Sequence, residues 1–145
     1  MQVSILPWKK DDIPFITALE KECFTDAWTR EQLINAFQRT DFYGLKLLID
    51  GAIVGYLCAT KLFEEAELLI IAVAEQYRGL GFGGNLMDEF LHAMKAGGVE
   101  KVFLEVRLSN LAAKTLHERR GFVPTRVREK YYADGESALE MVKTL

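Results

Sequence analysis

One stretch of the sequence decides the fold: residues 67–110 read ELLIIAVAEQYRGLGFGGNLMDEFLHAMKAGGVEKVFLEVRLSN. The apolar run from Leu68 to Val73 has the length and the branched residues of a buried strand. A glycine-dense turn follows it, and then an amphipathic helix that Gly97-Gly98 ends. A second apolar run, Val102 to Val106, completes a β-α-β unit. The two strands of such a unit are expected to be parallel.

The turn between the first strand and the helix reads RGLGFGG, from Arg78 to Gly84. Without Cβ atoms its backbone N–H groups can converge, and the start of the following helix adds partial positive charge. The alternative is that these glycines only turn the chain. Each of them, however, weakens a helix start by roughly 1 kcal/mol. The turn is therefore predicted to hold a phosphate or a pyrophosphate.

Two phosphate-binding patterns fit the same residues. Gly79 to Gly84 satisfies G-x-G-x-x-G, and Glu105 follows about 20 residues later, as in dinucleotide-binding domains. The residues from Arg78 to Gly83 also satisfy R-x-x-G-x-G. The C-terminal part favours the second pattern, because it is typical of an antiparallel hairpin rather than of further parallel strand–helix units. A dinucleotide domain also leaves the residues before Glu67 unexplained.

Length and composition predict one globular domain over residues 1–145, with 50% hydrophobic and 27% charged residues. The net charge of −3 argues against a general polyanion binder, so no DNA partner is expected. Cys23 and Cys58 are expected to pack as small apolar residues rather than to form a disulfide. His92 and His117 lack metal-ligand spacing, so no metal is expected. Without a signal peptide or a membrane-spanning apolar segment, a cytoplasmic protein with no membrane partner is expected.

The remaining sequence predicts the elements around this unit. Each has a local signal: an alternating pattern, a helix cap or a tight-turn dipeptide. They are an edge strand at 2–6, helices after Asp11-Asp12 and after Thr29, strands at 43–49 and 52–62 around Asp50-Gly51, a helix capped by Ser109 or Asn110, and strands at 123–132 and 137–142 around Asp134-Gly135. The order β-α-α-β-β-β-α-β-α-β-β predicts an α/β fold, a mixed sheet with helices on both faces.

This order and the R-x-x-G-x-G turn resemble the GCN5-related N-acetyltransferases (GNAT), and the resemblance covers nearly the whole chain. The turn alone marks only this broad family. Further runs resemble the ribosomal-protein-alanine N-acetyltransferases of the RimI type and their N-terminal acetyltransferase relatives. They are Cys23-Phe24 with Trp28, Ile71-Ala72-Val73, Leu104 to Asn110, Gly121-Phe122, and Tyr131-Tyr132 with Asp134-Gly135. The run EVR-x-SN with the paired tyrosines is much more specific than the turn.

The resemblance implies acetyl-CoA as the cosubstrate and assigns residues to it. Ile71, Ala72 and Val73 would line the pantetheine and the thioester with their backbone groups. Asn110 would bind near the pantetheine arm, and Glu105 would be the general base. The pyrophosphate would be held by Arg78, Gly79, Leu80, Gly81, Phe82, Gly83 and Gly84. Two residues depart from the family: His117 stands where a tyrosine acid is usual, and Ala27 where a proline is usual.

The chemistry of amine acetylation gives Glu105 and His117 their expected roles. An amine must be neutral to attack a thioester, so a positioned base helps. Glu105 interrupts an apolar strand, which suits a base in a cavity; the alternative is a structural pair with Arg107 on the same strand face. His117, with an ordinary pKa near 6.5, suits protonation of the CoA thiolate. The alternatives are a histidine without a catalytic role, release without an acid, or donation by another tyrosine.

Four aromatic residues are expected at the substrate. Tyr131 and Tyr132 would point to opposite faces of a regular strand, so at least one would face the substrate groove. The alternative is that both are core and edge residues. Phe24 and Trp28 would wall the pocket for the first substrate residue, or else pack as a hydrophobic staple. A basic cluster is expected to be a solvated face, or else to contact an acidic substrate or ribosomal RNA: Arg119, Arg120, Arg126, Arg128 and Lys130.

The sequence thus predicts an acetyl-CoA-dependent N-acetyltransferase that acts on the α-amino group of a protein N-terminus. A ribosomal protein with an N-terminal alanine is implied by the resemblance alone. A backbone N–H near Val73 would stabilise the oxyanion. Three alternatives remain open: an acetyltransferase for a small amine or a lysine, a non-enzymatic acetyl-CoA-binding module, and a nicotinamide-dependent dehydrogenase.

Overall fold

The computed structural model describes all residues, 1–145, and its element order is the predicted one. Two short 3-10 turns, η1 (Lys10–Asp12) and η2 (Glu75–Tyr77), add to it. The helices are α1 (Ile13–Cys23), α2 (Arg30–Phe37), α3 (Phe82–Ala96) and α4 (Leu111–Arg119). The strands are β1 (Val3–Pro7), β2 (Phe42–Ile49), β3 (Ala52–Leu62), β4 (Glu65–Val73), β5 (Lys101–Arg107), β6 (Val123–Arg128) and β7 (Ala138–Thr144).

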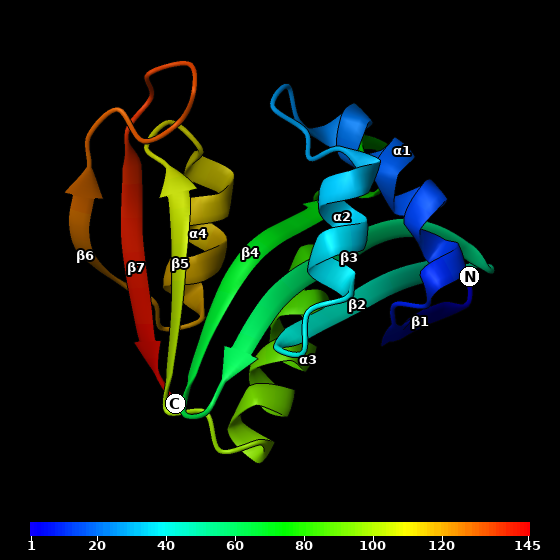
Figure 1. Ribbon diagram of the computed structural model, residues 1–145, viewed down its shortest axis with the longest axis horizontal. Helices are drawn as coiled ribbons and strands as arrows, with labels where there is room; N and C mark the ends of the chain where they lie inside the picture. Colours follow the sequence, from blue (N-terminus) through cyan, green and yellow to red (C-terminus); the bar gives the residue numbers. More distant parts are fainter.

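The seven strands form one mixed sheet in the order β1-β2-β3-β4-β5-β7-β6, in which β4 and β5 are the parallel pair. Helices α1 and α2 cover one face of the sheet, and α3 and α4 lie on the other face (Figure 1). The shared face of α3 and α4 has a topological reason. Helix α3 connects β4 and β5, which are parallel. Helix α4 connects β5 and β6, which run in the same direction because both are antiparallel to β7. Connections between strands of the same direction are right-handed, which places both helices on one face.

The sheet splits at its centre, and this split positions the site. Strands β4 and β5 pair only from Glu65↔Lys101 to Leu68↔Leu104, although both strands continue beyond these pairs. In Figure 1 they diverge toward their C-terminal ends. The separation begins at a bulge in β4. Leu69 is the bulged residue, because it has no partner in the register between Ala59↔Leu68 and Cys58↔Ile70. A bulge bends its strand, which turns β4 away from β5.

The local signals of the sequence explain most element boundaries. Asp50 and Gly51 both have positive φ, as the tight turn of a β2–β3 hairpin requires. Thr29 caps α2, with its hydroxyl accepting from the Gln32 N–H at 3.1 Å and the Gln32 side chain accepting from the Thr29 N–H at 2.8 Å. Asp12 precedes α1 but does not cap it, because its carboxylate binds Lys46 at 2.7 Å.

The predicted strand through Tyr132 is wrong. Strand β6 ends at Arg128, and residues 129–137 form a loop to β7 that contains both Tyr131 and Tyr132. Lys130 has a left-handed φ of 52°, which no strand accommodates. The Asp134-Gly135 turn lies inside this loop, where the Gly135 N–H donates to the Tyr132 carbonyl at 2.9 Å. Lys130 therefore lies outside β6, unlike Arg126 and Arg128 of the same basic cluster.

The core lies on both faces of the sheet, under α3 on one face and under α1 and α2 on the other. Phe82, Leu86, Phe90 and Met94 of α3 are buried, as their helical spacing predicts. No helix of the structure combines the length and the apolar character needed to cross a membrane.

Candidate active site

A cavity of about 410 Å³ lies at the split between β4 and β5. It brings together seven of the predicted site residues: Phe24, Trp28, Ile71, Glu105, Asn110, His117 and Tyr132. Ala72, Val73, Tyr131 and the glycine turn do not line it. The walls come from the α1–α2 loop, the two diverging strands, the start of α4 and the β6–β7 loop. Segments far apart in the sequence thus meet at one opening in the sheet.

The open edge of β4 is one wall of this cavity. Past Leu68 the strand has β3 on one side and no partner on the other, so its backbone polar groups on that side are free to bind a ligand. The end of this edge is already used: the Val73 carbonyl accepts from Arg78 Nε at 2.8 Å and from the Cys23 thiol at 3.8 Å. Arg78 therefore fixes the glycine turn against β4 through its side chain.

The glycine turn has the shape of an anion site. Gly79 and Gly81 have φ values of 76° and 87°, and Gly81 is the N-cap of α3 without a side-chain cap. Nothing lies within 4 Å of a Cβ built on either glycine, so the turn faces open space at the start of a 15-residue helix. The free N–H groups and the helix dipole suit a pyrophosphate. Gly84 packs against the guanidinium of Arg120, where a Cβ would collide.

Asn110 caps α4, as the sequence predicted, and also has a free amide nitrogen. Its Oδ1 accepts from the Ala113 N–H at 3.1 Å and so caps α4. The amide nitrogen makes no bond within the chain and is left for a ligand in the cavity that Asn110 lines. The open strand edge, the glycine turn and this amide together fit an acyl-CoA.

Glu105 lies in the cavity with 18% of its side chain exposed, and it does not pair with Arg107. Its Oε1 lies 3.2 Å from Nε of Arg128, on β6. The alternative of a structural pair with Arg107 does not hold, because loop carboxylates take Arg107 instead. On the neighbouring strand β7, the residue opposite Glu105 is Glu140. Arg128 also contacts Glu140, at 3.0 Å. One guanidinium therefore serves two neighbouring carboxylates.

The two tyrosines of the β6–β7 loop occupy different places. A hydrogen bond with the Glu105 carboxylate, together with partial burial, raises the pKa of Tyr131 to about 12. Tyr131 therefore stays protonated beside Glu105, although it does not line the cavity. Tyr132 does line it, half-buried, and burial is the main reason that its pKa is raised. The two rings are in contact edge to face, with centroids 5.1 Å apart.

His117 is the buried residue of α4, only 3% exposed, whereas Leu111 at the start of the helix is 70% exposed. Its ring packs edge to face on Phe122, and its Nδ1 has no hydrogen-bond partner in the chain. Burial, reinforced by the charge of Arg120, lowers the pKa of His117 to about 4. The imidazole is therefore neutral at pH 7, with one nitrogen that donates and one that accepts.

Glu20 of α1 was not predicted, and it supports the predicted substrate loop. It is 2% exposed; its Oε2 accepts from the Trp28 N–H at 2.9 Å, and its Oε1 accepts from the Tyr56 hydroxyl. Burial raises the pKa of this carboxyl group. The sequence held a signal, since Glu20 lies four positions after Ile16, on the buried side of the helix. A carboxylate there requires buried partners.

The comparisons with known proteins agree with this geometry. The sequence profile described as "Acetyltransferase (GNAT) family" matches residues 13–122. The chain therefore belongs to the GNAT family of acetyltransferases, and the prediction of an N-acetyltransferase with this fold is confirmed.

Its relatives define a narrower group within this family. A [ribosomal protein bS18]-alanine N-acetyltransferase of Haemophilus influenzae is 32% identical over 121 residues, 83% of this chain and 82% of the relative. An N-alpha-acetyltransferase of Sulfurisphaera tokodaii is 38% identical over 110 residues, 67% of this chain and 66% of the relative. The crystal structure of the ribosomal-protein-S18-alanine N-acetyltransferase from Escherichia coli superimposes with a TM-score of 0.93 at 27% identity, covering 99% of this chain and 94% of the other.

Proposed function

We propose that this chain transfers the acetyl group of acetyl-CoA to the α-amino group of a protein N-terminus. The observation that carries the proposal is the cavity in which the open edge of β4 and Asn110 meet Glu105 and an aromatic pocket. An N-terminal alanine of a ribosomal protein is the first substrate to test, because relatives with that name share about a third of the sequence. A ribosomal substrate would place the enzyme in the cytoplasm.

The cofactor side of the proposal assigns the phosphates to the glycine turn from Gly79 to Gly84. The pantetheine arm follows the open edge of β4, along Ile71 to Val73, and adds hydrogen bonds where β5 has separated from β4. The amide of Asn110 lies at the same cavity, from the other side of the split. When bound, acetyl-CoA supplies a thioester carbonyl that an amine can attack.

On the substrate side, Glu105 acts as the base. It removes a proton from the α-ammonium group, directly or through a water molecule, and the neutral nitrogen attacks the thioester carbon. A C–N bond forms, the C–S bond breaks, the CoA thiolate departs, and the nitrogen releases its second proton to water. A backbone N–H of β4 near Val73 stabilises the transient oxyanion. Arg128 keeps a positive charge beside Glu105, 3.2 Å from its Oε1.

His117 enters this scheme as a neutral imidazole, because burial lowers its pKa to about 4. At pH 7 its N–H can donate a hydrogen bond to the departing thiolate. Complete proton transfer from an imidazolium would need a pH near 4. A thiol has an ordinary pKa of about 8.5, so the thiolate can also take its proton from water.

The aromatic residues receive the first residues of the peptide. Phe24 and Trp28 line the cavity from the α1–α2 loop, and Tyr132 lines it from the opposite loop. The Tyr132 hydroxyl is placed to bond the peptide backbone, and the two apolar rings suit a small first side chain such as that of alanine. Tyr131 supports this wall through its contacts with Glu105 and with the ring of Tyr132.

The direct test is mass spectrometry of a peptide that begins with alanine and contains one internal lysine, after incubation with acetyl-CoA and this protein. Acetylation of the α-amine supports the proposal. Acetylation of the lysine alone, or no acetylation despite measured CoA binding, overturns it.

The role of Glu105 has a separate test. Glu105→Gln should bind CoA as the parent does and lose turnover by about 10²-fold or more. Glu65→Gln, at the exposed start of β4, is the matched control and should keep full turnover. Parent-level turnover of Glu105→Gln across pH 6 to 9 would remove Glu105 from the role of base.

A further inference from the structure

The mouth of the cavity lies between two loops that no strand ladder joins. The α1–α2 loop contributes Phe24 and Trp28, and the β6–β7 loop contributes Tyr132. The two loops lie on opposite halves of the split sheet, so hydrogen bonds between strands do not fix the distance between the loops. A peptide that reaches Glu105 has to pass between these loops. Some other contact must therefore hold the two walls at a set separation.

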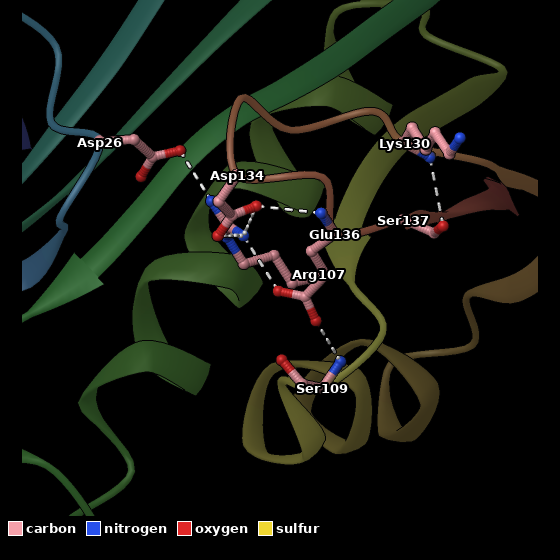
Figure 2. Close-up of polar contacts among 7 residues, drawn as sticks. All are labelled: Asp26, Arg107, Ser109, Lys130, Asp134, Glu136 and Ser137. Carbon is pink, nitrogen blue, oxygen red and sulfur yellow. Dashed lines mark hydrogen bonds and ion pairs between the residues drawn. The ribbon is translucent and has the colours of Figure 1, made fainter.

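Arg107, the last residue of β5, makes that contact (Figure 2). One terminal nitrogen donates to Asp26 Oδ2 of the α1–α2 loop at 2.9 Å. The other donates to Asp134 Oδ2 and to Glu136 Oε1 of the β6–β7 loop, each at 2.9 Å. A single planar guanidinium thus bridges both loops. A lysine, with one point charge, does not reproduce this geometry.

Further contacts make the β6–β7 side of this bridge rigid. The Arg107 guanidinium lies 4.0 Å from the ring centroid of Tyr132, in cation–π geometry. Glu136 Oε2 accepts from the Ser109 N–H at 3.0 Å, just before α4. Asp134 Oδ1 accepts from the Glu136 N–H at 3.0 Å. Arg107 therefore fixes the ring of Tyr132, whereas Asp26 fixes the loop that carries Phe24 and Trp28.

The charges of the network make it persistent near neutral pH. The hydrogen bond with Glu136 is the main reason that the pKa of Arg107 is raised. The pKa values of Asp134 and Glu136 are both lowered, by hydrogen bonds from the Glu136 backbone and from Ser109 first, and by Arg107 second. Asp134 and Glu136 therefore stay ionised at pH 7, and their bonds with Arg107 persist under ordinary assay conditions.

We propose that Arg107 is a positioning residue for the peptide substrate, which clasps the α1–α2 loop to the β6–β7 loop and sets the width of the cavity mouth. This rests on the proposed function, because it assumes that a peptide end is what enters there. Arg107 contacts no residue of the glycine turn, so its loss should leave the cofactor side intact. The clasp is thus a determinant of peptide binding, separate from the base and from the acetyl-CoA site.

The first experiment uses hydrogen–deuterium exchange and needs no substrate. Arg107→Met should speed exchange in residues 24–29 and 130–137, while exchange in the glycine turn stays as in the parent. Lys46→Met is the matched control, because Lys46 is 7% exposed, pairs with Asp12 at 2.7 Å and does not line the cavity. It should lower the melting temperature without changing exchange in either loop. Unchanged exchange in both loops of Arg107→Met would overturn the clasp.

The second experiment measures the Michaelis constants for an Ala-starting peptide and for acetyl-CoA. Arg107→Met should raise KM for the peptide by about 10-fold and change KM for acetyl-CoA by less than about 2-fold. Arg107→Lys should recover only part of the peptide affinity. Equal increases in both constants, or none, would reduce Arg107 to a general structural role. If the parent does not acetylate the peptide, the proposed function fails, and the exchange experiment still decides the clasp.

Discussion

Arg128 lies 3.2 Å from Glu105, so the proposed base is ion-paired before any substrate arrives. The pairing has a reason in the register of the sheet. Glu105 of β5 faces Glu140 of β7, and like charges directly opposite in a sheet repel. Arg128 contacts both carboxylates and separates their charges. The arginine thus holds the two carboxylates next to each other at the cavity that Glu105 lines.

Replacing Arg128 with methionine should therefore lower turnover. Without the guanidinium, Glu105 faces Glu140 with no positive charge between them and loses the partner that holds its carboxylate in place. We expect kcat/KM for an Ala-starting peptide to fall by about 10-fold. Arg126→Met is the control, because Arg126 pairs with Glu140 and not with Glu105. A parent-level kcat/KM in Arg128→Met would show that this ion pair does not support the base.

His117 should make the protein less stable in mild acid. Burial lowers its pKa to about 4, while the unfolded chain has a pKa near 6.5. Between these values the unfolded chain binds a proton that the folded chain refuses, so the free energy of unfolding falls as the pH falls. The loss from this residue is about 2 kcal/mol between pH 7 and pH 5, and above pH 6.5 the stability is fully present.

Urea unfolding of His117→Gln at these two pH values measures this contribution. In His117→Gln, most of the difference in the free energy of unfolding between pH 7 and pH 5 should be absent, whatever the stability of this variant at pH 7. His92→Gln, at an exposed position of α3, should keep the parent difference. The same pH dependence in the parent and in His117→Gln would contradict a buried neutral imidazole.

The sequence predicted the elements that local patterns encode, and missed contacts made across long separations. The β-α-β unit, the Asp50-Gly51 hairpin and the Thr29 cap depend on residues a few positions apart, and all three are confirmed. The partners of Arg107 were missed because they come from two loops, 81 positions away for Asp26, 27 for Asp134 and 29 for Glu136, which is beyond the reach of any periodic pattern.

The place of the paired tyrosines could not be predicted from strand periodicity for a related reason. Their residue types favour a strand, but the left-handed Lys130 ends β6 before them, and the bonds of Arg107 hold the loop in its observed shape. Tertiary contacts thus override the local preference for a strand. Phe24, Trp28, Glu105, Asn110 and His117 were nevertheless expected at one site, and the structure brings them to one cavity.

The α1–α2 loop, which carries Phe24 and Trp28, should depend on Glu20, whereas CoA binding should not. Glu20→Ala leaves the Trp28 N–H and the Tyr56 hydroxyl without their acceptor, which should lower the free energy of unfolding by about 2–4 kcal/mol. KM for an Ala-starting peptide should rise, because Trp28 loses its backbone anchor, while the Kd for CoA should stay near that of the parent.

Tyr56→Phe is the control for this prediction. It removes the hydroxyl that donates to Glu20 but keeps the bond from the Trp28 N–H, so it should destabilise the protein with little change in KM for the peptide. Thermal unfolding measures the stability of both variants, and steady-state kinetics gives their KM for the peptide. If Glu20→Ala and Tyr56→Phe raise KM for the peptide equally, the effect comes from general stability and not from the Trp28 anchor.

The glycine turn allows a test that separates backbone strain from cofactor binding. Gly81 and Gly51 have nearly the same φ, 87° and 85°, and nothing lies within 4 Å of a Cβ built on either. An alanine at each position should therefore cost a similar free energy of unfolding, roughly 1–2 kcal/mol, from left-handed strain alone. Gly81 begins α3 at the proposed phosphate site, whereas Gly51 lies in the β2–β3 turn.

Isothermal titration with CoA should then distinguish the two variants. Gly81→Ala should weaken CoA binding by about 10-fold, because the added methyl group and the shifted backbone disturb the converging N–H groups. Gly51→Ala should bind CoA as the parent does, at a matched loss of stability. Equal CoA affinities in the two variants would mean that the turn merely reverses the chain, and the phosphates would then have to be held elsewhere on the protein.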